Sequence, residues 1–305
     1  MRILLTGATG FVGRYAHEEL TNQGYEVICL VRNKERAKAI LPKANLFQAD
    51  LYNSSDIKTA VSEIKPEVVI HLVGILYERG RDTFTEVHLG HTKRLLDACL
   101  NSGVRRFVLM SSLGTSPKAP SLYHQTKFLA ETEVIQSGIE YIILRPSIIL
   151  GPEQRLLKDL WSLTRFLRLL AIPEPSYLFQ PIDVRDIKRA LAGAVRISPP
   201  NKPIELCGPS TISIKCLFSQ IIAGFNRRVI ILPAPKKLLE LSASLSDTLR
   251  LNLPISKDQL LMMWKDNICG LEENVISDGV RFLTGQEPIP LKESIKWSLE
   301  GFSPT

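Results

Sequence analysis

Three glycines at a GxxGxxG spacing constrain this chain more than any other feature. Gly7, Gly10 and Gly13 follow an apolar run at residues 3–5 and precede an amphipathic stretch at 12–20, which indicates a strand, a tight turn and a helix start. The first glycine permits the sharp bend, the second lets the backbone approach a pyrophosphate, and the third lets the helix pack closely on the strand. The helix N-terminus then offers unpaired N–H groups to phosphates. The stretch predicts a dinucleotide site formed by Gly7, Thr9, Gly10, Phe11, Val12 and Gly13; the alternative is a glycine-rich turn without a ligand.

The first half of the chain alternates short apolar runs with helical patterns, which is typical of βαβ units and a parallel sheet. We expect strands at 2–5, 26–31, 46–48, 68–72, 107–110 and 141–144, and helices at 13–22, 56–64, 84–101 and 123–136. Several strands are continuous apolar runs, as expected when both faces of a sheet are covered. The predicted fold class is α/β, a doubly wound parallel Rossmann sheet with its ligand at the carboxyl ends of the strands.

The regular alternation of strand and helix patterns ends after Gly151 and Pro152. We expect helices at 156–170 and 183–196, a strand at 203–206 that returns to the sheet, and a short strand at 229–232. The predicted division is a dinucleotide-binding domain at 1–150, to which 184–207 returns. A smaller, mostly helical substrate or partner domain is expected from 151–183 and 208–305.

Composition and net charge limit which partners and which membrane association are expected for this chain. The 305 residues carry a formal net charge of +7 without a Lys/Arg block, so a nucleic acid is not an expected partner, whereas a phosphate-rich cofactor, an anionic partner or a membrane face is compatible. No apolar run is long enough to span a membrane, and the first strand leaves no room for a signal peptide.

The cysteines and histidines show no spacing that is typical of a metal site, so no metal is expected. The cysteines are odd in number, widely spread and without a CxxC pair. We therefore expect them to be reduced and mostly buried, in a cytoplasmic or equivalent reducing compartment, with a peripheral position at a membrane as an alternative. They are Cys29, Cys99, Cys207, Cys216 and Cys269.

The end of the second strand indicates which cofactor binds. An acidic residue there would accept hydrogen bonds from the ribose 2′-OH of NAD, whereas an arginine accommodates the 2′-phosphate of NADP. The chain has Arg32 at this tip, with Lys34 and Arg36 beyond it, so NADP(H) is favoured and NAD(H) stays open. Further cofactor contacts are expected from Asp50 and Leu51 at the adenine and from the backbone of Leu72, Val73 and Gly74.

A serine pair and a Tyr-x-x-x-Lys spacing indicate proton-transfer chemistry. Ser111 and Ser112 follow the fifth strand, and Tyr123 and Lys127 share one helix face. Together with the glycine turn, this arrangement resembles the short-chain dehydrogenase/reductase superfamily. The resemblance implies that Ser112 binds the substrate oxygen and Ser111 supports the turn. Tyr123 would exchange a proton, and Lys127 would lower the pKa of Tyr123 and hold the ribose.

Three further segments narrow the resemblance to the extended and atypical branches, which include NAD-dependent epimerases and dehydratases. Residues 144–152 look like an "LRPSxIxGP" segment, which implies that Arg145, Pro146, Ser147 and Ile148 lie near the nicotinamide. Residues 179–187 resemble "FQPIxVxDVA". Residues 253–260 with Asp266 and Asn267 resemble the "LPLTxDQL…DN" tail of one subgroup, the proteins similar to the nucleotide-binding accessory subunit of respiratory complex I.

The resemblance leaves two functions open. The leading one is an NADP(H)-binding oxidoreductase of the reductase, epimerase or dehydratase type, acting on an unidentified carbonyl or hydroxyl substrate. The alternative is a non-catalytic, nucleotide-binding structural or assembly factor of a membrane complex. His88 stands where relatives often carry Asn in a "VNxxGT" pattern, and residues 173–178 lack the usual glycine-rich segment. Residues 161–170 indicate either a basic amphipathic helix at a membrane or partner surface, or a helix whose apolar face lies in the core.

Overall fold

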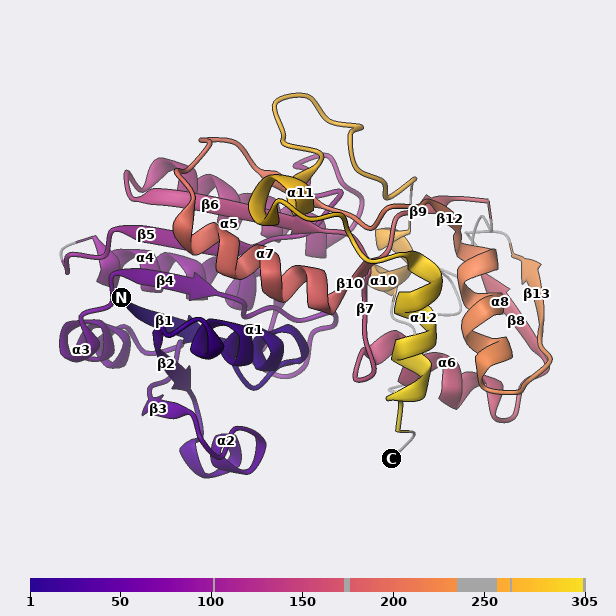
Figure 1. Cartoon of the computed structure of the whole chain (residues 1–305), viewed down its shortest axis with the longest axis horizontal. Coiled ribbons are helices and arrows are strands. Elements are labelled where there is room, and N and C mark those ends of the chain that lie inside the picture. Colours follow the sequence, from indigo (N-terminus) through magenta and orange to yellow (C-terminus); the bar gives the residue numbers. More distant parts are fainter. Residues whose placement is uncertain (101, 173–175, 235–256, 264, 304–305) are drawn as a thin grey trace.

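The computed structural model of the chain describes residues 1–100, 102–172, 176–234, 257–263 and 265–303. A central sheet with helices on both faces is joined to a second layer of helices and short strands (Figure 1). Within the described residues, no helix is long and apolar enough to cross a membrane.

The central sheet has seven strands, all parallel, in the order β11-β6-β5-β4-β1-β2-β3. The strand order reverses between β1 and β4, and the carboxyl ends of the strands at such a reversal form the ligand crevice of doubly wound sheets. The predicted Rossmann fold is confirmed. The strands are β1 Arg2–Thr6, β2 Glu26–Val31, β3 Asn45–Gln48, β4 Val68–His71, β5 Arg106–Met110, β6 Glu140–Pro146 and β11 Ile204–Leu206.

Each face of the sheet has its own apolar core. One face is covered by α1 (Phe11–Asn22), α7 (Val184–Arg196) and α11 (Gly279–Thr284), whose apolar stripes include Leu20, Leu191 and Leu283. The other face is covered by α3 (Ser54–Ile64), α4 (His91–Cys99) and α5 (Leu122–Gln136). The short helix α2 (Lys34–Ile40), which the sequence reading did not include, begins after Asn33, whose side chain accepts a hydrogen bond from the Arg36 N–H.

The remaining elements surround a third core beside the carboxyl ends of the strands. Its main helices are α6 (Arg155–Thr164), α8 (Ile214–Gly224), α10 (Lys257–Met262) and α12 (Leu291–Glu300). Its strands form three pairs: β7 Ile149–Leu150 with β10 Ile182–Asp183, β9 Leu178–Phe179 with β12 Ile212–Ser213, and β8 Leu169–Ile172 with β13 Ile230–Pro233.

Two predicted helices differ from the structure. The helix expected at 156–170 ends at Thr164, because residues 169–172 pair with β13; the apolar periodicity runs on into the strand and tertiary pairing overrides it. The helix expected at 84–101 begins as a π-helix, η1 (Thr85–Gly90), before α4. Of the basic amphipathic helix considered at 161–170, only residues 161–164 are helical, and residues 169 and 170 belong to strand β8.

The expectation that all five cysteines are reduced is wrong for one pair. Cys207, at the end of β11, forms a disulfide with Cys269, 62 residues further along the chain. The fold brings these two segments together, and the spacing of the cysteines in the sequence does not predict their pairing. Cys29 and Cys99 are buried and free, as expected, and Cys216 is free but exposed. Cysteine usage therefore gives no support to a reducing compartment.

Candidate nucleotide-binding and active site

The glycine turn has the geometry of a phosphate cradle. Gly7 has a φ of +74°, and its carbonyl accepts a hydrogen bond of 2.9 Å from the Gly10 N–H. A Cβ on Gly13 would lie 2.1 Å from the Gly7 oxygen, so only glycine lets α1 pack this closely on the turn. No side chain caps α1, and its first turn holds no acidic residue. The N-terminal N–H groups of α1 therefore suit a pyrophosphate.

A cluster of charged side chains lies around the tip of β2. Arg32 is 60% exposed and its guanidinium lies 3.8 Å from the carboxylate of Asp82. Arg81 pairs with Asp50 at 3.0 Å and stacks over the ring of Tyr52. Arg32 thus stands where the sequence placed it, with a weak contact that an anionic ligand can replace. Asp50 already has a cationic partner, and its contact to an adenine stays a prediction.

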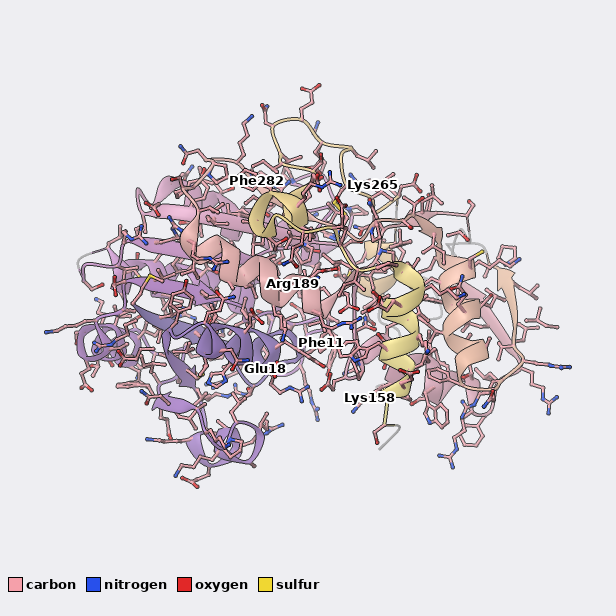
Figure 2. All side chains as sticks on the ribbon, viewed as in Figure 1. Phe11, Glu18, Lys158, Arg189, Lys265 and Phe282 are labelled. Atoms are coloured by element: carbon pink, nitrogen blue, oxygen red, sulfur yellow. A yellow bond between two sulfur atoms is a disulfide. The ribbon has the colours of Figure 1, made fainter. Side chains whose placement is uncertain are left out.

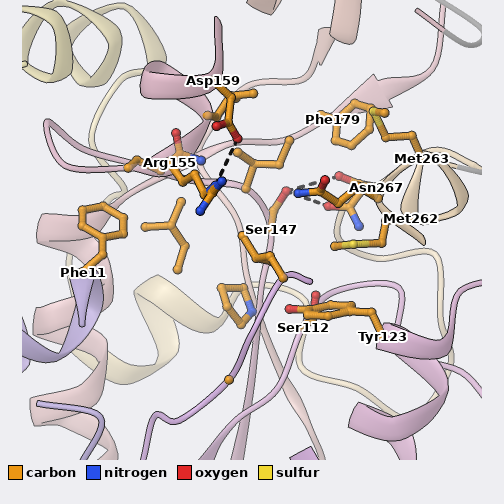
Figure 3. Close-up of a pocket in the computed structure, with 18 of the residues that line it drawn as sticks. Phe11, Ser112, Tyr123, Ser147, Arg155, Asp159, Phe179, Met262, Met263 and Asn267 are labelled. Atoms are coloured by element: carbon orange, nitrogen blue, oxygen red, sulfur yellow. Dashed lines mark hydrogen bonds and ion pairs between the residues drawn. The ribbon is translucent and has the colours of Figure 1, made fainter. Parts of the chain in front are cut away.

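Ser112, Tyr123 and Lys127 line one cavity of about 490 Å³. Figure 3 shows Ser112 beside the phenol of Tyr123, and the serine hydroxyl forms a hydrogen bond that lowers the pKa of that phenol. Lys127 comes from the next turn of α5, and its ammonium donates to the Met110 carbonyl at 2.9 Å. Both Tyr123 and Lys127 are buried. The structure brings the three predicted side chains together.

The electrostatics of these groups differ from the prediction. Burial raises the pKa of Tyr123 above its ordinary value; the Ser112 hydrogen bond lowers that pKa without offsetting burial, and the nearby charge of Asp258 raises it further. Burial also lowers the pKa of Lys127 to about 8, against the opposing effect of Glu131. The expectation of a lowered Tyr123 pKa is wrong, because desolvation dominates and the ammonium is directed to a backbone carbonyl. The direction of this pKa shift favours the protonated form of the Tyr123 phenol, which can donate a proton.

His88 has a defined position in the site. Its Nε2 accepts a hydrogen bond from the Ile75 N–H at 3.2 Å, so Nδ1 carries the proton and donates to Thr126 at 2.9 Å. Its ring meets that of Tyr123 edge-on, with the centroids 5.2 Å apart. Burial, then the nearby charge of Lys127, lower the pKa of His88 to about 2. His88 is therefore a neutral group that joins the loop after β4, at Ile75, to the helix that carries Tyr123.

The tail segment has structural contacts that the sequence reading missed. The Asp258 carboxylate accepts hydrogen bonds from the backbone N–H groups of Leu122 and Tyr123 at 2.8 and 3.2 Å, and so caps α5 from a distant part of the chain. Asn267 accepts a hydrogen bond from Ser147 at 2.9 Å and donates to the Leu113 carbonyl at 3.1 Å. The resemblance of this segment to the tail of one subgroup was the sequence feature that could have indicated these contacts. Residues 253–256 of the same motif lie outside the described residues.

The predicted cofactor residues fall into two groups. Arg145 is held by its side chain in a buried ion pair with Glu131 at 2.6 Å and by Glu272 at 2.7 Å, so it does not line the cavity. Figure 2 shows Phe11 at the start of α1, on the side that faces the third core. The cavity is lined by Phe11, Leu72, Gly74, Ser111, Ser112, Tyr123, Lys127, Pro146, Ser147 and Ile148. Outside its lining are Gly7, Thr9, Gly10, Val12, Gly13, Arg32, Asp50, Leu51, Val73 and Arg145.

Residues 7–158 match the NAD(P)H-binding family. The fold also resembles solved structures. A nucleoside-diphosphate-sugar epimerase from Staphylococcus aureus superposes with a TM-score of 0.74, 18% identity and coverage of 97% of this chain and 100% of the other. The NADPH-dependent quinone oxidoreductase QOR2 of Escherichia coli, solved with NADPH, superposes with a TM-score of 0.73 and 19% identity. The match covers 96% of this chain and 98% of the other. Residues 7–158 therefore belong with the NAD(P)H-binding family, and the whole chain has the same fold as these solved structures.

The chain is also similar in sequence to curated subunits of mitochondrial complex I. It is 27% identical over 278 residues to the "NADH-ubiquinone oxidoreductase 40 kDa subunit" of Neurospora crassa, covering 89% of this chain and 73% of that one. It is 30% identical over 218 residues to the "NADH dehydrogenase [ubiquinone] 1 alpha subcomplex subunit 9" of Arabidopsis thaliana, covering 68% of this chain and 54% of that one. The chain thus spans about half to three quarters of these relatives.

Proposed function

We propose that this protein is an NADP(H)-dependent oxidoreductase that reduces a carbonyl group in the cavity beside Tyr123. The observation that carries the proposal is that the side chains of Ser112, Tyr123 and Lys127 line one cavity, with the buried Tyr123 phenol beside the Ser112 hydroxyl. Tyr123 would donate its proton to the carbonyl oxygen, and Ser112 would hold that oxygen. Bound dihydronicotinamide would supply the hydride. Lys127 would hold the nicotinamide ribose, and His88 would position Tyr123 by packing on its ring.

The experiment is the Tyr123→Phe variant. The change removes one oxygen and retains the ring that packs on His88 and Phe84, so the fold and NADPH binding are expected to persist. Loss of a general acid lowers turnover by about 10²–10⁴-fold. Tyr25→Phe, which lies beyond the C-terminal end of α1 and outside the cavity lining, is the matched control and is expected to turn over normally. Full activity of Tyr123→Phe would exclude the proposed acid.

We also propose that NADP(H) is the preferred cofactor. Arg32, with Lys34 and Arg36 next along the chain, offers cationic groups at the tip of β2, and Asp82 is the acidic group nearest to the Arg32 guanidinium at 3.8 Å. Arg32→Glu is expected to weaken NADPH binding far more than NADH binding, whereas Arg165→Glu, an exposed arginine in another part of the chain, is expected to change neither. Equal losses for NADPH and NADH in Arg32→Glu would refute the 2′-phosphate role.

The second candidate is a nucleotide-binding subunit or assembly factor of a membrane complex. The complex I names of the relatives support it, together with an exposed apolar surface on β8, β13 and the turn before β8. Phe166 is 82% exposed, Ile230 63% and Leu169 51%, and the register pairs Leu169 with Ile230. If this surface binds a membrane complex, the double variant Phe166→Ser/Ile230→Ser should leave the membrane fraction of cells, while Tyr123→Phe should stay there and complement a deletion fully.

A further inference from the structure

The cavity beyond Ser112 and Tyr123 has walls that come from separate segments of the third core. Helix α6 contributes Leu156, Leu160 and Leu163, and strand β8 contributes Leu170 and Ile172. Two phenylalanines and the end of α10 close the far side: Phe179, Phe218, Leu260, Met262 and Met263. Figure 3 shows Phe179, Met262 and Met263 on the wall that faces Ser147, with Tyr123 nearby. The walls beyond the hydroxyl groups are therefore predominantly aliphatic and aromatic.

The charged groups on these walls already have partners. Arg155 approaches Asp159 at 3.4 Å, donates to the Tyr77 hydroxyl at 2.6 Å and stacks on the Tyr77 ring. Glu153 accepts a hydrogen bond from Tyr15 at 2.8 Å. Among the described lining residues, Arg155 and Lys127 are the cations and Glu153 and Asp159 the anions, so the lining carries no net charge.

This balance disfavours a nucleotide sugar. A diphosphate brings about two negative charges, and Arg155 would have to leave Asp159 to compensate one of them, while the Lys127 ammonium is held at the Met110 carbonyl. A diphosphate would also lie among the carboxylates of Glu153 and Asp159, which repel it. An uncharged substrate neither requires Arg155 to leave Asp159 nor suffers repulsion from the carboxylates of Glu153 and Asp159.

We infer that the cavity binds an uncharged carbonyl compound with an apolar chain, of which a long straight-chain ketone is the simplest representative. This inference rests on the proposed reduction. The carbonyl oxygen lies at Ser112 and Tyr123, and the chain extends between α6 and α10. Met262 and Met263 adapt their shape to chains of different length, because methionine is unbranched and flexible.

The reaction balances without a further reactant. The reduced cofactor would supply the hydride that forms a C–H bond at the carbonyl carbon, and the electron pair of the C=O π bond would move to the oxygen. The oxygen takes the Tyr123 proton, and Tyr123 is reprotonated from solvent. The products are a secondary alcohol and the oxidised cofactor.

The test uses a homologous series of straight-chain methyl ketones, from butanone to undecanone, with NADPH and the full chain. Each methylene moved from water to an apolar wall contributes about 0.8 kcal/mol, or about a fourfold rise in kcat/KM, until the cavity is filled. In Leu163→Glu the slope should flatten, whereas Ser162→Glu, an exposed neighbour on the same helix, should keep it.

Direct binding separates this inference from the proposed reduction. Calorimetry with NADP⁺ present is expected to show affinity that rises with ketone length and no measurable binding of UDP-glucose. Length-dependent binding without reduction would support the inference and refute the proposed function. Affinity independent of length, or tighter binding of UDP-glucose than of undecanone, would overturn the inference whatever the turnover.

Discussion

The close contact between Gly13 and the glycine turn makes a sharp prediction for Gly13→Ala. The new Cβ would lie 2.1 Å from the Gly7 oxygen and 2.7 Å from the Ala8 Cα, where ordinary contacts are 3.4–4 Å. Both atoms are backbone, so α1 must move by about 1 Å from β1. Alanine in a helix is otherwise favoured by about 1 kcal/mol over glycine, whereas overpacking costs about 1–3 kcal/mol and sometimes more. Because both contacts are with backbone atoms, the upper end of the overpacking cost applies, about 3 kcal/mol, and the helix gain of about 1 kcal/mol leaves a net loss of stability of about 2 kcal/mol.

The same displacement moves the N–H groups that would face the pyrophosphate. We expect NADPH affinity to fall at least about tenfold, equivalent to about 1.4 kcal/mol. The assays are urea denaturation without nucleotide and NADPH titration followed by fluorescence.

Gly24→Ala is the matched control for this prediction. Gly24 has a φ of +82° with no atom within 4 Å of its Cβ position, so alanine there carries only backbone strain of about 1–2 kcal/mol. It should lose stability and keep its NADPH affinity. If Gly13→Ala were as stable as the wild type and bound NADPH normally, the contact and the cradle would both be refuted.

Three further predictions concern the buried groups around the site. Because burial lowers the pKa of Lys127 to about 8, its ammonium loses a proton as pH rises through that value, and NADPH-dependent reduction should fall over the same pH range. The pH–rate profile of Lys127→Met should not show this fall. His88→Leu leaves the part-buried Ile75 N–H unpaired, so denaturation should show a loss of about 1 kcal/mol, with a larger fall in turnover than in NADPH affinity; unchanged kcat would contradict the positioning role. Cys207→Ser opens a covalent loop of 62 residues and should lose about 2–4 kcal/mol in denaturation without reductant, whereas Cys216→Ser should change nothing.

The sequence predicted those parts of the molecule whose cause is local. Gly7 and Gly13 meet steric demands within one turn, and Tyr123 and Lys127 share a helix face through their spacing alone. The parallel strands are visible as short apolar runs, because a sheet covered on both faces needs them. These features required no knowledge of distant contacts, and the structure contains each of them.

The parts that could not be predicted depend on contacts between distant segments. The end of α6 at Thr164 follows from the pairing of β8 with β13, which are about 60 residues apart in the chain. The raised pKa of Tyr123 follows from burial that its neighbours in sequence do not reveal. The Cys207–Cys269 disulfide and the cap of α5 by Asp258 likewise join segments that only the fold brings together.

The tail segment connects the fold to the site in a way that explains its sequence pattern. Asp258 fixes the first turn of the helix that carries Tyr123, and Asn267 joins Ser147 to the Leu113 carbonyl, just after Ser112. The disulfide at Cys269 lies two residues beyond Asn267. The tail therefore fixes Tyr123 and Ser147, which both line the cavity, by direct hydrogen bonds. These contacts are a structural reason for an acidic residue and an asparagine at these positions.

We propose that Tyr123 and the bound cofactor together reduce a carbonyl group in this cavity. The most direct measurement uses NADPH deuterated at the transferable position of the nicotinamide, with undecanone as substrate, and mass spectrometry of the alcohol. The wild type should place one deuterium on the carbinol carbon in each turnover, and Tyr123→Phe should bind the cofactor with normal affinity and form almost no alcohol. Deuterated alcohol from Tyr123→Phe at the wild-type rate would contradict the account.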